Sequence, residues 1–209
     1  MKTLRLLVTG ASSQVGSALC IRASNAGMTV IGFDDAILNS VQLESIQAVI
    51  STSKPDYVIN TVSYSVVDLA QDNPQKTHVV NQHVALVLAQ ACDALGLPLL
   101  HLSSDYVFDG LQRVPYKEGA YTDPVNRFGE AKLAAEKEIK QHCAKHIILR
   151  VGWIFSAYGN NFVLRTLRQL QEHHHVKAVS DQQGCPTYAN DVARVLIAII
   201  MQLECDINV

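Results

Sequence analysis

The sequence predicts an α/β protein of the Rossmann type, built on a doubly wound parallel sheet. Short apolar runs alternate along the chain with longer amphipathic stretches, and the runs are rich in Val, Ile and Leu without strict polar–apolar alternation. Such runs are typical of strands that a parallel sheet buries on both faces. The stretches between them are long enough to be crossover helices. The five predicted strands are residues 4–8, 29–33, 57–62, 97–102 and 146–151.

The helical stretches carry start and stop signals at their ends. Pro74 suits the first turn of a helix, and Gly96-Leu97-Pro98 ends the long helix that follows it. We therefore expect crossover helices over residues 14–26, 41–53, 74–95 and 125–143, and two further helices over 161–172 and 191–203.

Composition and charge exclude several classes of protein. With 48% hydrophobic and 17% charged residues among 209, the chain has the balance of a folded globular protein and not of a disordered one. A net charge of −2 argues against a nucleic-acid surface or a polybasic membrane patch. The longest apolar run, residues 195–200, is too short to span a bilayer. The first apolar run leads into Thr9-Gly10, so we interpret it as a strand and not as a signal peptide.

Cysteine and histidine usage bears on the compartment and on metal binding. Five widely spaced cysteines without a CxxC pair predict reduced thiols and a cytoplasmic location. His173-His174-His175 closes a predicted helix with no carboxylate or cysteine at ligand spacing. We therefore expect a solvated helix end there and no metal site.

A glycine-containing turn follows the first predicted strand. It reads Gly10-Ala11-Ser12-Ser13-Gln14-Val15-Gly16 and opens a helix. Gly10 permits a tight turn, Gly16 allows close packing of helix on strand, and free N–H groups at the helix start suit a pyrophosphate. Ser13 replaces the middle glycine of the usual pattern. The order strand–turn–helix predicts dinucleotide binding, against the alternative of a merely structural turn.

Two carboxylates follow the second predicted strand. Asp34 and Asp35 stand where an acidic residue can bind the hydroxyls of an adenosine ribose and repel a 2′-phosphate. This favours NADH slightly over NADPH. An acidic loop cap is the alternative interpretation.

Candidate catalytic residues follow the fourth predicted strand. The run Ser103-Ser104-Asp105-Tyr106 places hydroxyl, carboxylate and phenol groups at the carboxyl end of a strand, where ligands of such sheets bind. In the later helix, Phe128 and Lys132 lie one turn apart on the same face. We expect three charged residues of that helix on its solvated face: Arg127, Glu130 and Glu136.

Here the sequence resembles the extended short-chain dehydrogenase/reductases, and more narrowly the dTDP-4-dehydrorhamnose reductase family. The matching segments run along nearly the whole chain. They are Pro55-Asp56-Tyr57-Val58-Ile59-Asn60, Val67-Asp68, Val80-Asn81, Ser103 to Gly110, Arg150-Val151-Gly152-Trp153, Gly159-Asn160-Asn161-Phe162 and Asp181-Gln182-Gln183-Gly184-Cys185-Pro186-Thr187.

The resemblance implies a role for each candidate residue. Ser104 would bond the keto oxygen of the sugar, and Lys132 would hold the nicotinamide ribose and keep a neighbouring phenol acidic. Ser13, Gln14 and Val15 would approach the pyrophosphate. The cofactor would also be lined by Thr61, Val62, Ser63 and Tyr64, and the substrate by Ser65, Asp105, Tyr106 and Trp153.

One position departs from the family pattern. The family motif is Tyr-x-x-x-Lys, and this chain has Phe128 in the tyrosine position. Phenylalanine has no proton to give to the carbonyl oxygen, and losing a positioned acid costs about 10²–10⁴-fold in rate. Four explanations stay open: a degenerate member that binds without turnover, Tyr106 as substitute donor, a substitution made on purpose to trap a complex, or drift that kept apolar packing.

The resemblance also bears on domains and function. Family members continue into a small C-terminal lobe, so we expect one Rossmann-type domain over residues 1–209 with an incomplete substrate lobe beginning near 153. The predicted function is NAD(P)-dependent reduction of a 4-keto nucleotide sugar, impaired at Phe128. A non-catalytic NAD(P)-binding regulatory or scaffold protein is the alternative, and a homodimer is left open.

Overall fold

The computed structural model describes residues 2–34 and 42–205 and contains a five-stranded parallel sheet in the order β2-β1-β3-β4-β5. Neighbouring strands are in parallel register; Leu7 of β1, for example, pairs with both Ile31 and Val58. This confirms the Rossmann-type prediction. The strands are β1 (Arg5–Thr9), β2 (Thr29–Phe33), β3 (Tyr57–Asn60), β4 (Leu99–Ser104) and β5 (His146–Val151).

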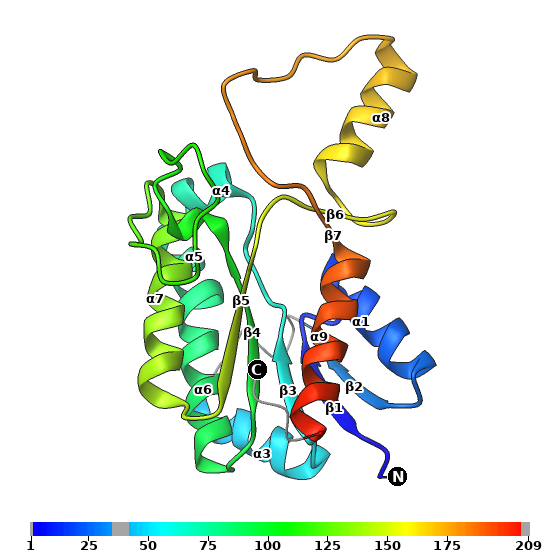
Figure 1. The fold of residues 1–209 in the computed structure, drawn as a ribbon, viewed down its shortest axis with the longest axis vertical. Coiled ribbons are helices and arrows are strands. Elements are labelled where there is room, and N and C mark those ends of the chain that lie inside the picture. The colour runs from blue at the N-terminus through cyan, green and yellow to red at the C-terminus, as the bar shows by residue number, and fades with distance from the viewer. Residues whose placement is uncertain (1, 35–41, 206–209) are drawn as a thin grey trace.

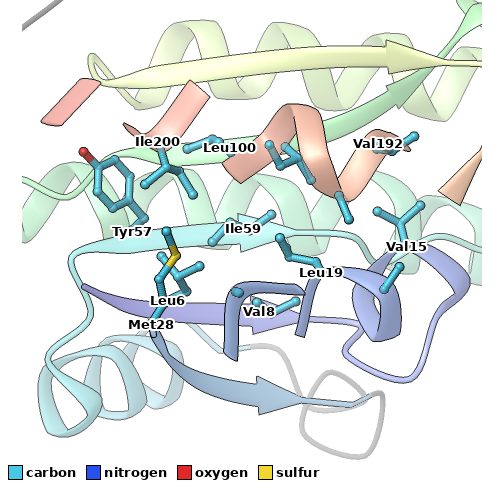
Figure 2. Packing of buried hydrophobic residues seen from close by; sticks show 14 of the residues in the cluster. Leu6, Val8, Val15, Leu19, Met28, Tyr57, Ile59, Leu100, Val192 and Ile200 are labelled. Carbon is cyan, nitrogen blue, oxygen red and sulfur yellow. The ribbon is translucent and has the colours of Figure 1, made fainter. Parts of the chain in front are cut away.

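Helices cover both faces of the sheet (Figure 1). On one face, α1 (Gln14–Asn25) and α9 (Ala189–Glu204) pack together over β1, β3 and β4 (Figure 2). Ile59 and Leu100 lie in that core. The opposite face carries α3 (Leu43–Ser53), α6 (Val84–Ala94) and α7 (Arg127–His142), which bury a second apolar cluster.

Burial on both faces holds for the inner strands only. Every residue of β3 and β4 is buried, as predicted for strands between two helical layers. Every residue of β5 is only half-buried, and Thr29 and Gly32 of β2 are exposed. These two strands form the edges of the sheet, so each has a neighbouring strand on one side only.

The predicted long helix after the third strand is interrupted. Pro74 does begin a helix, but α5 (Pro74–His78) passes through a π-helical turn (Val79–His83) before α6 starts. A short helix that the sequence analysis did not predict, α4 (Val67–Asp72), precedes them.

The segment after β5 leaves the sheet and then returns to it. A parallel pair of two-residue strands, β6 (Ile154–Phe155) and β7 (Thr187–Tyr188), brackets the excursion. Between them α8 (Phe162–His173) stands apart from the two helical layers, with none of its residues buried (Figure 1). Residues 189–204 then pack back on α1. A substrate lobe beginning near residue 153 stays a prediction.

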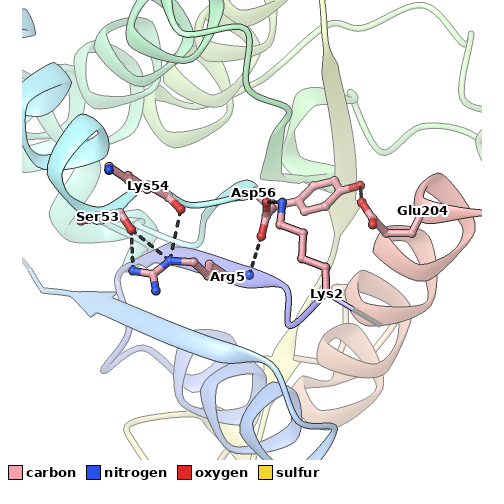
Figure 3. Close-up of polar contacts among 7 residues, drawn as sticks. Lys2, Arg5, Ser53, Lys54, Asp56 and Glu204 are labelled. Carbon is pink, nitrogen blue, oxygen red and sulfur yellow. Dashed lines mark hydrogen bonds and ion pairs between the residues drawn. The ribbon is translucent and has the colours of Figure 1, made fainter.

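Polar contacts fasten the amino ends of the strands, far from the carboxyl ends where ligands of such sheets bind (Figure 3). The guanidinium of Arg5 donates to the carbonyl oxygen of Ser53, at 2.7 Å from Nη2, and its backbone N–H donates to Asp56 Oδ2 at 2.8 Å. The phenol of Tyr57 donates to Glu204 Oε1 at 2.7 Å and so ties the end of α9 to β3. Within the described ranges, no helix is long and apolar enough to cross a bilayer.

Candidate functional site

The chain reverses its direction of winding between β1 and β3. From β1 the sheet grows to β2 on one side and to β3, β4 and β5 on the other. The connections that leave the carboxyl ends of β1 and β3 enter opposite helical layers, which opens a crevice between them. Both the glycine turn and the segment after β3 lie at this crevice.

At Gly10 and Gly16, the backbone of the turn after β1 lies too close to neighbouring atoms for a residue with a Cβ. Gly10 has a φ of +71°, and a Cβ there would lie 3.0 Å from both Thr61 Oγ1 and the Val62 nitrogen. A Cβ on Gly16 would lie 2.1 Å from the Gly10 carbonyl oxygen. The backbone of the turn is therefore pressed against both α1 and the segment after β3.

Ser13 serves as the N-cap of α1. Its Oγ accepts the N–H of Gly16 at 3.0 Å and lies 3.0 Å from Thr61 Oγ1. The Thr61 hydroxyl donates to the carbonyl oxygens of β1's end, 2.8 Å from Thr9 and 2.9 Å from Gly10. The N–H groups of Gln14 and Val15 belong to the first helical turn, where no intrahelical acceptor can reach them. They are free to bind an anion at the positive end of α1.

A hollow of about 300 Å³ lies beside this turn. Gln14 forms part of its wall and accepts hydrogen bonds from Ser156 Oγ and Asn161 Nδ2, each at 2.9 Å. The glycine turn is thereby joined to the segment that leads into α8. The hollow is lined by Ser12, Ser13, Gln14, Ser17, Ile21, Tyr158 and Gly159.

The carboxylate of Asp34 turns toward the glycine turn. Its Oδ1 accepts the backbone N–H of Ser12 at 2.7 Å, while the residue as a whole is exposed. This contact is the loop-capping alternative of the sequence analysis, although one carboxylate oxygen can still accept a ribose hydroxyl. Asp35 lies outside the described residues.

Asn81 holds the segment after β3. The backbone N–H of Tyr64 donates to Asn81 Oδ1 at 2.8 Å, and Asn81 Nδ2 donates to the Tyr64 carbonyl at 3.2 Å. Asn81 lies in the π-helical turn and is buried. Val62 is buried and Tyr64 half-buried, whereas Ser63 and Ser65 are exposed.

Ser104 and Asp105 form a hydrogen-bonded pair at the end of β4. The Ser104 hydroxyl donates to Asp105 Oδ1 at 3.1 Å and accepts the Tyr106 N–H at 3.2 Å. The carboxylate fits against Gly152, where a Cβ would lie 2.3 Å from Asp105 Oδ2. Burial raises the pKa of Asp105, and hydrogen bonds from Ser104 and from the backbone N–H groups of Asp105 and Tyr106 oppose the rise only in part.

Phe128, which the resemblance puts in the tyrosine position of the family motif, is buried in the first turn of α7. It is 5% exposed, and its ring meets the Tyr106 ring edge-on with centroids 5.6 Å apart. Gly129 presses the first turn of α7 on the end of β4, since a Cβ there would lie 2.1 Å from the Tyr106 carbonyl oxygen. Burial raises the pKa of Tyr106, and the charges of Asp105 and Asp68 raise it further.

Lys132 is buried one turn after Phe128. It is 2% exposed, and its Nζ donates to the Leu102 carbonyl oxygen at 2.8 Å. Burial lowers its pKa to about 8, against the opposing attraction of Glu136. A lysine buried to this degree is rare outside functional sites.

Glu136 corrects the sequence analysis. It was expected on the solvated face of its helix, but its side chain is 1% exposed, whereas Arg127 and Glu130 are exposed as predicted. Its carboxylate accepts hydrogen bonds from Ser103 Oγ at 2.6 Å and from Arg150 Nε and Nη2 at 2.8 and 2.6 Å. A carboxylate can be buried here because these donors satisfy it, and helical periodicity places Glu136 below Lys132.

His101 and Asn60 form a further buried polar pair that the sequence analysis did not single out. The Val62 N–H and the Thr9 hydroxyl donate to Asn60 Oδ1 at 3.1 and 2.9 Å, so Asn60 Nδ2 donates to His101 Nδ1 at 3.1 Å. Burial, with the nearby charge of Lys132, holds the His101 pKa well below its usual value. The pair links the carboxyl end of β3 to the middle of β4.

Trp153 leaves β5 in a conformation that favours glycine. Its φ is +42°, and the residue is 39% exposed. The indole lies on Gly184, where a Cβ would come within 2.3 Å of Trp153 Cε2, and the Trp153 carbonyl accepts the Thr187 N–H at 3.1 Å. Trp153 is therefore the residue after Gly152, against which the Asp105 carboxylate packs, and it contacts the segment before β7.

Comparison with known proteins places this arrangement in a family. The family model described as RmlD substrate binding domain matches residues 4–209. The chain is 35% identical over 204 residues to a dTDP-4-dehydrorhamnose reductase of Sinorhizobium fredii, covering 96% of this chain and 67% of that protein. It is 32% identical to the Escherichia coli protein of the same name, covering 91% of this chain and 64% of the relative.

Solved structures give the same result. A Bacillus anthracis dTDP-4-dehydrorhamnose reductase in complex with NADP superposes with a TM-score of 0.91 at 30% identity, covering 96% of this chain and 71% of that one. A Brucella ovis UDP-glucose 4-epimerase in complex with NAD, 17% identical with a TM-score of 0.84, shares the fold. The chain spans about two thirds of the length of the curated relatives it matches. The chain belongs to the RmlD substrate binding domain family, and so to the dTDP-4-dehydrorhamnose reductases that the sequence resembles.

Proposed function

We propose that this protein binds a nicotinamide dinucleotide across β1 and β3 and reduces the 4-keto group of a dTDP-linked sugar, as its relatives' names describe. The observation that carries the proposal is Lys132, a lysine buried against β4 with its Nζ on the Leu102 carbonyl oxygen and a pKa lowered to about 8. Burying an ammonium group is costly, and a core without a ligand to bind gains nothing from it.

The residues present fit a dinucleotide. Gly10 and Gly16 leave no room for a Cβ, and the N–H groups of Gln14 and Val15 lie at the positive end of α1, where an anion can bind. Thr61 and Tyr64 would line its path toward Lys132, which would bind the nicotinamide ribose. When bound, the reduced nicotinamide supplies a hydride to the carbonyl carbon of the substrate.

The protein's own part in the reaction is to orient the sugar and to protonate its oxygen. Ser104 would donate its hydroxyl hydrogen bond to the keto oxygen, with Asp105, Tyr106, Ser65 and Trp153 around the substrate. Phe128 has no proton to give, so we expect a rate about 10²–10⁴-fold below that of an enzyme with a phenol there. The phenol of Tyr106 is one candidate for the missing donor.

We further propose that NADH is bound somewhat more tightly than NADPH. The support is Asp34, whose carboxylate lies at the end of β2, where a 2′-phosphate would meet a negative charge. The Bacillus anthracis relative was solved with NADP, so the preference is a property to be measured on this chain.

The cytoplasm is the compartment we propose. All five cysteines are free thiols, and Cys92 and Cys143 are buried as small apolar residues. Unpaired cysteines are usual where thiols stay reduced. Fractionation of the native host tests this location.

Phe128 also favours a second candidate function. A buried phenylalanine in the tyrosine position is what a non-catalytic NAD(P)-binding regulatory or scaffold protein would have, because such a protein needs the cofactor site and not the proton donor. The two functions differ in turnover alone.

The experiment measures binding and turnover on the native protein and on Phe128→Tyr. NADH and NADPH are titrated by fluorescence, and consumption of each is followed with dTDP-4-dehydrorhamnose. Binding by both proteins, with faster turnover in Phe128→Tyr, is the expected result. Tyr121→Phe, at a side chain 84% exposed, is the matched control.

Three outcomes would each contradict one part of the proposed function. If neither cofactor binds at millimolar concentration, the cofactor site is wrong. If both proteins bind cofactor and neither consumes it, the binding or regulatory function replaces the reductase. If the native protein is as fast as Phe128→Tyr, the expected impairment at Phe128 is wrong.

A further inference from the structure

We propose that Asp105 delivers the proton to the substrate oxygen through the hydroxyl of Ser104, in place of the missing phenol. This inference rests on the proposed function. It starts from the hydrogen bond that joins Ser104 Oγ to Asp105 Oδ1 at 3.1 Å. It makes Ser104 the group that touches the substrate and Asp105 the proton source behind it.

The two residues are placed for such a relay. Ser104 is 6% exposed at the end of β4, and the Tyr106 N–H holds its oxygen at 3.2 Å. Asp105 occupies a notch that only glycine permits, since a Cβ on Gly152 would meet Oδ2 at 2.3 Å and Cγ at 2.7 Å. The carboxyl group is therefore held at a fixed distance from the hydroxyl instead of turning into solvent.

The local charges suit an acid. Burial raises the pKa of Asp105, and the groups that oppose the rise are the Ser104 hydroxyl and two backbone N–H groups, those of Asp105 and Tyr106. Asp68 carries the same sign as Asp105, and its charge acts on the adjacent Tyr106. A carboxyl group in such surroundings keeps its proton closer to neutral pH than an exposed one.

The step balances in atoms and electrons. The carbonyl carbon gains a hydride, and the π electron pair of the C=O bond moves to the oxygen. When Asp105 is protonated, its O–H donates to Ser104 Oγ across the same 3.1 Å contact, and the serine hydroxyl turns from Asp105 to the substrate oxygen. That oxygen takes the hydrogen of Ser104 Oγ, and Ser104 takes the acidic proton of Asp105. Asp105 ends as a carboxylate and regains its proton from water, so one hydride and one proton are added in each turnover.

Tyr106 is less suited to the task. Its ring lies edge-on against the Phe128 ring, with the two centroids 5.6 Å apart. It therefore packs beside the position that the family's tyrosine would occupy. Burial, Asp105 and Asp68 all raise its pKa above the usual value, which makes the phenol a weaker acid. Lys132, the cation that would make a phenol more acidic, has its Nζ on the Leu102 carbonyl.

The test introduces Asp105→Asn into two backgrounds, the native protein and Phe128→Tyr, and measures kcat and KM separately. Asparagine keeps the shape and the acceptor oxygen for Ser104 but has no acidic proton. In the native background we expect kcat to fall about 10²-fold or more, with KM changed only a few-fold. In Phe128→Tyr the new phenol supplies the proton, so the same substitution should lower kcat less than about 10-fold. Asp123→Asn, at an exposed carboxylate, is the matched control.

A second measurement needs no change at Asp105. The native kcat should fall as pH rises through the pKa of Asp105, because the proton source is lost, and Phe128→Tyr should lack this decline. If Asp105→Asn lowers kcat equally in the two backgrounds, or changes KM alone, Asp105 is a substrate ligand and not the proton source. The same pattern obtained with Tyr106→Phe would assign the proton to Tyr106.

Failure of this proposal and failure of the proposed function give different results. Turnover by Phe128→Tyr with none by the native protein would overturn the relay and keep the reductase. Cofactor binding without turnover in either background would overturn the reductase itself, and the relay with it.

Discussion

Replacing Glu136 by glutamine should destabilise the protein by about 3 kcal/mol. The side chain is 1% exposed and accepts hydrogen bonds from Ser103 and twice from Arg150. Removing one partner of a buried ion pair costs about 3–5 kcal/mol. We place the loss at the low end because the Arg150 side chain is 20% exposed and its Nη1 also donates to the Glu118 carbonyl at 3.1 Å.

The assay is urea unfolding of the native protein, Glu136→Gln and Glu130→Gln. Glu130 lies on the same helix, 54% exposed and 3.5 Å from Arg127, so its loss should change stability by less than about 1 kcal/mol. For a chain of this size, the loss at Glu136 corresponds to a melting temperature lower by roughly 6–12 °C. Cofactor affinity should also fall, because Glu136 supports the charge of Lys132.

Acid provides a second signature. Burial alone would raise the pKa of Glu136, but hydrogen bonds from Arg150 and Ser103 and the charges of Arg150 and Lys140 lower it below the usual value of a glutamate. Its stabilisation is therefore complete above about pH 4.5 and is lost as pH falls through the lower folded value. The difference in free energy of unfolding between the native protein and Glu136→Gln should become smaller in that pH range. Two results would refute the claim that the buried Glu136 carboxylate stabilises the fold. One is that Glu136→Gln loses no more stability than Glu130→Gln, and the other is that its difference from the native protein grows as the pH falls.

Three further predictions concern the cofactor site. Gly16→Ala places a Cβ 2.1 Å from the Gly10 carbonyl oxygen, so it should lower the free energy of unfolding in urea by about 1–3 kcal/mol. It should also weaken NADH binding in a fluorescence titration. The control Gly119→Ala, whose Cβ would have no atom within 4 Å, should change neither quantity. Lys132→Met should raise the free energy of unfolding of the cofactor-free protein by about 2 kcal/mol near neutral pH. The lowering of the lysine pKa to about 8 costs about 3 kcal/mol, and loss of the hydrogen bond to the Leu102 carbonyl offsets about 1 kcal/mol of that gain. That gain should shrink as pH rises from the folded toward the unfolded pKa, and a variant less stable than native would contradict it. Asp34→Ser should improve NADPH affinity more than NADH affinity, and equal changes would remove the proposed role of Asp34.

Local signals in the sequence were sufficient for most of the fold. The runs that form β1 and β3 are apolar without alternation, the fourth strand lies two residues further along than predicted (β4, Leu99–Ser104), and the signals at Pro74 and Gly96 mark helix ends that the structure confirms. The interruption at Val79–His83 was not predictable, because a π-helical turn has no propensity signature of its own. Asn81, which accepts the Tyr64 N–H of the segment after β3, lies in this turn.

By itself, the sequence determined the fold class, the family and the absence of a phenol at Phe128. Strand–turn–helix order, glycine spacing and residue identity are local properties that a chain carries before it folds. Tertiary structure alone decided what surrounds each charge. Glu136 is buried because Ser103 and Arg150, from two different strands, satisfy it, and Asp105 is held against Ser104 because Gly152 leaves room for its carboxyl group. Burial and acidity depend on neighbours that are distant in sequence, so the burial of Glu136 and the raised pKa of Asp105 could not be predicted from the chain alone.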